Sequence, residues 1–89
     1  MAWTIELSPV AEKTLARLDR PTAKRLDAFL RERLAKLTNP RSIGEALRGE
    51  LGDLWKYRVG DFRIIAAIED RRLVILVVRI RNRREVYKR

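Results

Sequence analysis

Residues 54–59 (LWKYRV) are predicted to form a strand, in which apolar and polar residues alternate from residue 55 to residue 59, as is typical of a β-strand with one buried face. Gly60-Asp61 follows, and a glycine at the first position of a two-residue turn indicates a hairpin, because that position requires a positive φ. Residues 62–69 then form the returning strand. This turn also sets the register, so that Arg58 lies opposite Arg63.

Three basic side chains fall on one face of this predicted hairpin. The side-chain period of two puts Lys56, Arg58 and Arg63 together, whereas Tyr57 and Ile64 point to the opposite face. Like charges that face each other directly destabilise a sheet, so the cluster indicates a site for an anion. A solvated basic surface, or one that only binds phosphate, is the alternative interpretation.

A continuous apolar run at residues 73–78 (LVILVV) predicts a third strand that is buried on both faces and therefore lies inside the sheet. The chain is strongly basic after this run. Tyr87, near its end, is a candidate for stacking on an RNA base. A generic basic tail, with a tyrosine that caps the last strand, is the alternative.

The first half of the chain predicts one strand and two helices. Alternation at residues 3–7 (WTIEL) indicates a short strand, and Ser8-Pro9 is a good helix start, because serine caps helices and proline is tolerated at the first helical position. One helix is expected over residues 9–18. A second, with apolar residues three and four apart, follows the break at residues 19–21 and ends at Asn39-Pro40.

Residues 39–53 (NPRSIGEALRGELGD) are predicted to be a loop, because glycines interrupt any regular element there. The apolar side chains expected to tuck down from this loop are Ile43, Ala46, Leu47 and Leu51. The predicted order is therefore β-α-α-β-β-β. This is an α+β fold, in which a helical hairpin covers one face of the sheet and the cationic face stays free. The place of the first strand in the sheet is left open.

Composition narrows the chemistry. With 89 residues, of which 46% are apolar, residues 1–89 are expected to form one domain. The sequence contains neither cysteine nor histidine, so disulfides, thiolate or imidazole metal ligands and histidine-based catalysis are excluded, and no cofactor or metal is expected. No signal-peptide pattern and no membrane-spanning apolar run occurs, which predicts a cytoplasmic protein.

The net charge of +9 is unevenly distributed. Residues 1–53 hold ten Lys/Arg and eight Asp/Glu, whereas residues 54–89 hold eleven Lys/Arg and four Asp/Glu. The positive field thus belongs to the sheet and the C-terminal segment. Nucleic acid is the leading partner class, ahead of an anionic protein or a membrane surface.

RNA cleavage by the ribose 2′-OH suits these residues. It needs positive charge on the phosphorane, a group that accepts the 2′ proton and a group that protonates the leaving oxygen. Repulsion from Arg58 and Arg63 makes Lys56 easier to deprotonate, so Lys56 is a candidate base. Glu85 is a less favoured one.

Three stretches together resemble the RelE/ParE toxin superfamily, on the RelE side: LRG at residues 47–49, WKYRVGDFR at residues 55–63 and REVY at residues 84–87. With the order of elements, the resemblance covers nearly the whole chain. It implies a fold similar to microbial ribonucleases and cleavage of mRNA in the ribosomal A site without metal. It also implies a partner, an antitoxin that holds the toxin inactive in a hetero-oligomer.

The resemblance also implies roles for single residues. Arg58 departs from the family, in which lysine is common at this position; since arginine cannot act as a base, that role is left to Lys56 or another group. The loop arginine of the family corresponds best to Arg83, with Arg81 as the alternative. The predicted catalytic residues are Lys56, Arg58, Arg63, Arg83 and Tyr87. The predicted RNA-binding residues are Arg48, Arg79, Arg81 and Arg84.

Two other functions are compatible with the same fold. A ParE-like toxin would inhibit DNA gyrase by binding it and would not cut RNA. An inactive relative would only bind nucleic acid. The combination of Lys56, Arg58, Arg63 and Tyr87 favours RNA cleavage.

Overall fold

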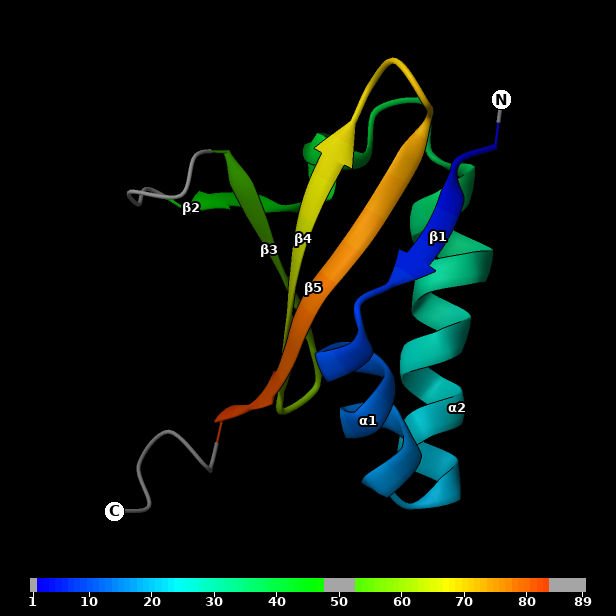
Figure 1. Ribbon diagram of the computed structural model, residues 1–89, viewed down its shortest axis with the longest axis vertical. Coiled ribbons are helices and arrows are strands. Elements are labelled where there is room, and N and C mark those ends of the chain that lie inside the picture. The colour runs from blue at the N-terminus through cyan, green and yellow to red at the C-terminus, as the bar shows by residue number, and fades with distance from the viewer. Residues whose placement is uncertain (1, 48–52, 84–89) are drawn as a thin grey trace.

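Two helices cover one face of a mixed five-stranded sheet (Figure 1). The computed structural model describes residues 2–47 and 53–83. Its strands are β1 (Thr4–Leu7), β2 (Glu45–Leu47), β3 (Leu54–Val59), β4 (Phe62–Glu69) and β5 (Val74–Asn82), in the spatial order β1-β5-β4-β3-β2. The helices are α1 (Pro9–Arg17) and α2 (Arg20–Ala28). The predicted α+β class is confirmed, with the helical hairpin on one face of the sheet.

The predicted hairpin register is confirmed as well. Val59 pairs with Phe62, and Arg58 pairs with Arg63, around a turn in which Gly60 has φ 59°. The apolar run forms an inner strand, β5, which lies between β4 and β1. β1 pairs with β5 in parallel, which answers the question that the sequence left open.

Side-chain caps start both helices. The Ser8 hydroxyl accepts a hydrogen bond from the N–H of Ala11 (3.1 Å) and donates one to the carbonyl of Val78 (2.7 Å), which ties α1 to β5. The Asp19 carboxylate accepts from the N–H (3.2 Å) and the hydroxyl (2.9 Å) of Thr22. These hydrogen bonds lower the pKa of Asp19.

The second helix changes its pitch instead of ending at Ala28. A π-helical turn (Phe29–Arg33) and a 3₁₀ turn (Leu34–Lys36) continue it. A spacing of four residues drifts around an α-helix, which has 3.6 residues per turn, and the wider π turn corrects this drift. Leu26, Leu30 and Leu34 therefore all stay in the core, with at most 1% of their surface exposed.

The prediction of a loop over residues 39–53 was wrong in part. Residues 40–43 form a 3₁₀ turn (Pro40–Ile43), and β2 follows as an edge strand of only three residues that pairs with the start of β3. Alternation over three residues is too short to read from a sequence. Ile43 and Ala46 are exposed rather than tucked down, Leu47 is half-buried, and Leu51 lies outside the described residues.

Tyr57 links this segment to the core. Its side chain is 1% exposed, and its hydroxyl donates a hydrogen bond of 2.7 Å to the carbonyl of Pro40, which is also buried. The ring lies 6.0 Å from that of Phe29, in a tilted arrangement. Burial disfavours the phenolate and raises the pKa of Tyr57 to about 12.

Replacing Tyr57 by phenylalanine is expected to lower the free energy of unfolding by about 1–3 kcal/mol, because the buried Pro40 carbonyl loses its donor. The difference from the parent should shrink between pH 10 and pH 12. A tyrosine of the unfolded chain has a pKa near 10, whereas the pKa of Tyr57 in the folded protein is about 12. Between these pH values ionisation stabilises the unfolded parent, so the parent loses the stability that the Tyr57 hydroxyl contributes, and the phenylalanine variant does not. Urea unfolding at several pH values measures both effects. Equal stability at pH 7 would contradict the prediction.

Candidate active site

Three arginines stand in a row across neighbouring strands on the face of the sheet that the helices leave open. Arg58 of β3 pairs with Arg63 of β4, which pairs in turn with Arg81 of β5. Side chains of directly opposed residues project to the same face, with Cβ atoms about 4.5–5.5 Å apart. The pair predicted from the hairpin is thus one part of a longer cationic row.

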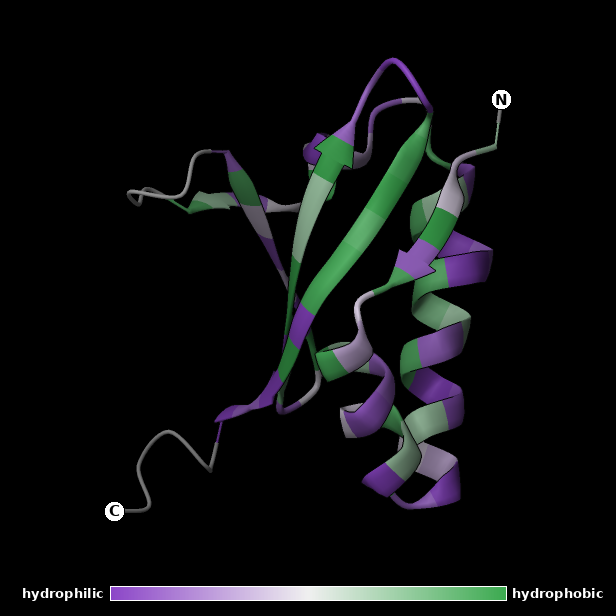
Figure 2. Ribbon diagram, viewed as in Figure 1, coloured by the Kyte–Doolittle hydropathy of each residue, from purple (hydrophilic) through white to green (hydrophobic). Residues whose placement is uncertain are grey.

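A β-bulge in β5 brings two of the arginines to this face. The register between β4 and β5 shifts here and leaves Val78 as the extra residue. Before the bulge, Val77 is buried in the core, and unbroken alternation would turn residues 79 and 81 inward as well. After it, Ile80 is the buried residue, and Arg79 and Arg81 are exposed. Figure 2 shows the change along β5, which is apolar over most of its length and polar near its C-terminal end.

A second row contains a carboxylate. Glu45 of β2 pairs with Lys56 of β3, and their side chains form an ion pair, with 3.5 Å between Oε1 and Nζ. The Lys56 side chain is 17% exposed and that of Glu45 66%, so the carboxylate lies at the solvent side of the ammonium. Lys56 pairs on its other side with Ile65, which pairs with Arg79. The ion pair thus places a carboxylate directly beside Lys56, the candidate base of the sequence analysis, and carboxylates also act as general bases.

Five members of the two rows line a shallow cavity of about 500 Å³; Arg58 and Glu45, at the outer ends of the rows, do not. Its floor is apolar and its rim is basic, a combination that suits a nucleobase and the phosphate attached to it. The residues that line it are Leu47, Leu54, Lys56, Arg63, Ile65, Val78, Arg79 and Arg81.

The position of β2, and hence of Glu45, is fixed by contacts of Arg41 in the preceding turn. The Arg41 guanidinium donates two hydrogen bonds to Asp70, of 3.0 Å to Oδ1 and 2.7 Å to Oδ2, and lies 5.8 Å over the ring of Trp55. This bidentate pair lowers the pKa of Asp70. It joins the turn before β2 to the turn between β4 and β5.

The structure therefore brings together four of the residues singled out in the sequence: Lys56, Arg63, Arg79 and Arg81. Arg58 lies in the arginine row but does not line this cavity. Arg83 is exposed at the end of β5, where its N–H donates to the carbonyl of Asp61 (2.7 Å). Arg48, Arg84, Glu85 and Tyr87 lie outside the described residues.

Glu45 is the residue that the sequence analysis missed. It was assigned to a loop, so no pairing partner was sought for it. Residues 45–47 show too little alternation to be recognised as a strand. Only the pairing register of β2 with β3 shows that Glu45 lies beside Lys56. A lone carboxylate in the sequence carries no such information.

A sheet with a helix-covered back and a cation-lined open face is the architecture that this chain shares with toxins of type II toxin–antitoxin systems. The sequence model for the ParE toxin of type II toxin–antitoxin systems (parDE) matches residues 5–87, and the chain belongs to this family, within the RelE/ParE superfamily. It is a type II toxin by family. Among the described residues, no helix is long and apolar enough to cross a bilayer, and no cluster of three metal-ligating side chains occurs.

The chain is also similar to individual toxins in sequence and in fold. Toxin RelG of Mycobacterium tuberculosis is 25% identical over 89 residues, which cover 100% of both chains. The toxin–antitoxin complex RelBE2 of the same organism has a TM-score of 0.84, at 23% identity and 93% coverage of each chain. The RelE–RelB complex of Pyrococcus horikoshii gives a TM-score of 0.75 at 24% identity, over 93% of this chain and 97% of that chain. These structural likenesses concern the fold.

Proposed function

We propose that this chain is a metal-independent endoribonuclease that cleaves mRNA in the ribosomal A site and is held inactive by a cognate antitoxin. The observation that carries the proposal is the carboxylate of Glu45, which forms an ion pair with Lys56 beside the arginine row on the open sheet face. Cleavage by the 2′-OH needs both a base and a positive environment for the phosphorane, and this face holds both. Ribosomal and cytoplasmic action belong to the same proposal.

In the proposed reaction, Glu45 accepts the proton of the ribose 2′-OH while the 2′ oxygen attacks the adjacent phosphorus. Lys56 holds the carboxylate in place across the 3.5 Å ion pair. Arg63 and Arg81 stabilise the charge on the phosphorane, and the bond from phosphorus to the 5′ oxygen breaks to leave a 2′,3′-cyclic phosphate. The attacking and leaving oxygens lie in line, so the leaving oxygen is on the side away from Glu45. A second group must protonate it, and Tyr87 is our candidate.

The remaining basic residues bind RNA in this proposal. Arg58 extends the row toward the edge of the sheet, and Arg79 lies on the cavity rim with Arg81. Arg83 continues the cationic face past the end of β5. Arg48 and Arg84 are proposed to contact the RNA backbone on the basis of the sequence alone. Phosphate contacts of this kind position a nucleic acid and do not read its sequence.

Inhibition of DNA gyrase is the second candidate, because the matching family model is that of the ParE toxin. A gyrase inhibitor needs a protein-binding surface and no base. The ion pair of Glu45 with Lys56, which lines the cationic cavity, has no evident use in that function. We therefore place RNA cleavage first.

Expression of the chain without its antitoxin is expected to stop growth and to produce cuts in translated messages. Mapping of mRNA 5′ ends before and after induction measures this, and a Glu45→Gln/Arg63→Gln variant serves as the inactive control. Both proteins should accumulate to equal levels if the site residues act in chemistry only. Intact messages with gyrase-dependent DNA breaks would move the assignment to the ParE activity.

A further inference from the structure

The bulge in β5 sends two successive side chains to the same face of the sheet. Val78 and Arg79 both line the cavity, whereas Val77 before them and Ile80 after them are buried. In a regular strand, successive side chains point to opposite faces. The bulge is therefore a local departure from strand geometry that the surrounding structure has to hold in place.

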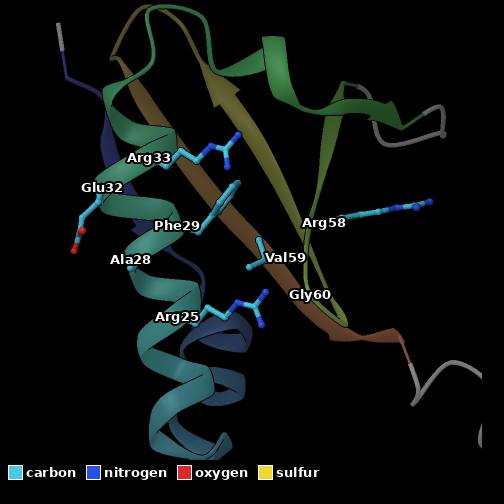
Figure 3. Close-up of a pocket in the computed structure, with 8 residues that line it drawn as sticks. All are labelled: Arg25, Ala28, Phe29, Glu32, Arg33, Arg58, Val59 and Gly60. Atoms are coloured by element: carbon cyan, nitrogen blue, oxygen red, sulfur yellow. The ribbon is translucent and has the colours of Figure 1, made fainter.

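This departure decides where two arginines lie. Without it Arg79 and Arg81 would turn toward the core, and with it they share the open face of the arginine row. The Arg58 side chain shows the direction of that face, since it projects from β3 on the side away from the second helix (Figure 3). A group that holds the bulge thus also holds the two arginines at the cavity.

Ser8 forms hydrogen bonds with two successive carbonyls at the bulge. Its N–H donates to the carbonyl of Val77 (2.9 Å), and its hydroxyl donates to that of Val78 (2.7 Å). Successive carbonyls of a regular strand point to opposite edges, but these two turn to the same residue. Val78 has no partner in the ladder with β4, so the Ser8 hydroxyl is the donor that its turned carbonyl meets.

Two elements fix the position of Ser8. β1 ends one residue before it and pairs with β5 up to Leu7–Val77, and α1 begins one residue after it. The hydroxyl oxygen accepts from the N–H of Ala11 (3.1 Å), while its single proton goes to the carbonyl of Val78. The same hydroxyl therefore caps a helix and holds a bulge.

We propose that Ser8 is a positioning residue for RNA cleavage, because its hydroxyl keeps the bulge at Val78 in the form that presents Arg79 and Arg81 to the substrate. Since cleavage at this cavity is itself proposed, this role rests on the proposed function. Charges stabilise a transition state most when they are in place before the reaction. A carbonyl left without its donor makes the bulge less favourable, so both arginines lose their fixed orientation.

Three substitutions separate the two uses of the hydroxyl. Ser8→Thr keeps the donor and the acceptor. Ser8→Asp keeps an acceptor for the helix but has no proton to donate at neutral pH, and Ser8→Gly lacks the hydroxyl while costing little at an N-cap. In single-turnover assays, Ser8→Asp and Ser8→Gly should lower the cleavage rate about tenfold, whereas Ser8→Thr should stay within about twofold of the parent. Ser8→Gly carries the test alone if Ser8→Asp does not fold.

A loss of stability has to be kept apart from a loss of positioning. Asp19→Ala is the matched control, because Asp19 is the exposed N-cap of the other helix and its carboxylate bonds to Thr22. This variant should lower the melting temperature and leave cleavage unchanged when both are assayed well below that temperature. An equal loss of cleavage in Asp19→Ala and Ser8→Asp would overturn the proposal.

A second background tests whether Ser8 acts through the arginines. In an Arg79→Gln/Arg81→Gln protein, Ser8→Asp should still destabilise the fold but should not reduce the remaining cleavage further. A residue with a purely structural role would reduce cleavage by the same factor in both backgrounds. That result would also overturn the proposal.

NMR makes the outcome separable from that of the proposed activity. The contact between Ile65 and Arg79 at the bulge should weaken in Ser8→Asp, whereas the contact between Ile68 and Ile75, away from it, should stay. A parent that shows this change but does not cut RNA would overturn the nuclease assignment and leave the hold of Ser8 on the bulge in place. Unchanged contacts in Ser8→Asp, or loosened contacts with normal cleavage, would overturn the positioning role.

Discussion

Replacing Arg63 by glutamine is expected to lower mRNA cleavage at least tenfold without lowering the melting temperature. Arg63 is the middle member of the arginine row, with Arg58 on one side and Arg81 on the other. Opposed like charges cost about 0.2–1 kcal/mol in the free protein, and exposure and salt reduce this cost. When a phosphate is bound, the same arginines become stabilising, because their positive charges are then shared with an anion. A tenfold loss corresponds to a barrier increase of about 1.4 kcal/mol.

Paired thermal melts and single-turnover cleavage assays measure the two effects on one preparation. The melting temperature should stay equal or rise slightly at low salt, and the rise should vanish at high salt. Arg71→Gln is the matched control, since it removes an exposed arginine from the turn between β4 and β5, away from the cavity. A clear drop in melting temperature with normal cleavage would make Arg63 a structural residue.

Much of the fold could be predicted because its signals are local. Strict alternation and a two-residue turn with glycine fix the register of β3 and β4 over every pair from Lys56–Ile65 to Val59–Phe62. Ser8 and Asp19 are helix caps that act within three residues of themselves. The inner position of β5 follows from its apolar run.

The features that the sequence did not reveal depend on pairing between distant segments. β2 is too short to show a period, and it forms only because β3 offers an edge. The bulge at Val78 shows in the sequence only as a change in the phase of the alternation, because the buried residues Val77 and Ile80 are three positions apart instead of two. That phase change places Arg79 and Arg81 on the open face of the sheet, and the apolar run before the bulge masks the signal.

The position of Glu45 is the feature that the sequence predicts least well. Replacing this residue is also expected to have the largest effect on cleavage. Replacing Glu45 by glutamine should lower cleavage by about 10²–10⁴-fold, the usual contribution of a general base, because the amide keeps the shape of the carboxylate but cannot accept the 2′ proton. Stability should change by less than about 1 kcal/mol, since the lost pair with Lys56 is largely exposed on the Glu45 side.

The variant separates chemistry from binding. Removing a negative charge from a cationic face should leave RNA affinity unchanged or increase it, so that kcat falls while KM does not rise. Glu6→Gln is the matched control, because Glu6 also forms a partly exposed ion pair, of 3.4 Å with Arg72, on another part of the sheet. That control should cleave as the parent does. If Glu45→Gln did so too, the base would have to be sought elsewhere, and Lys56 would return as the first candidate.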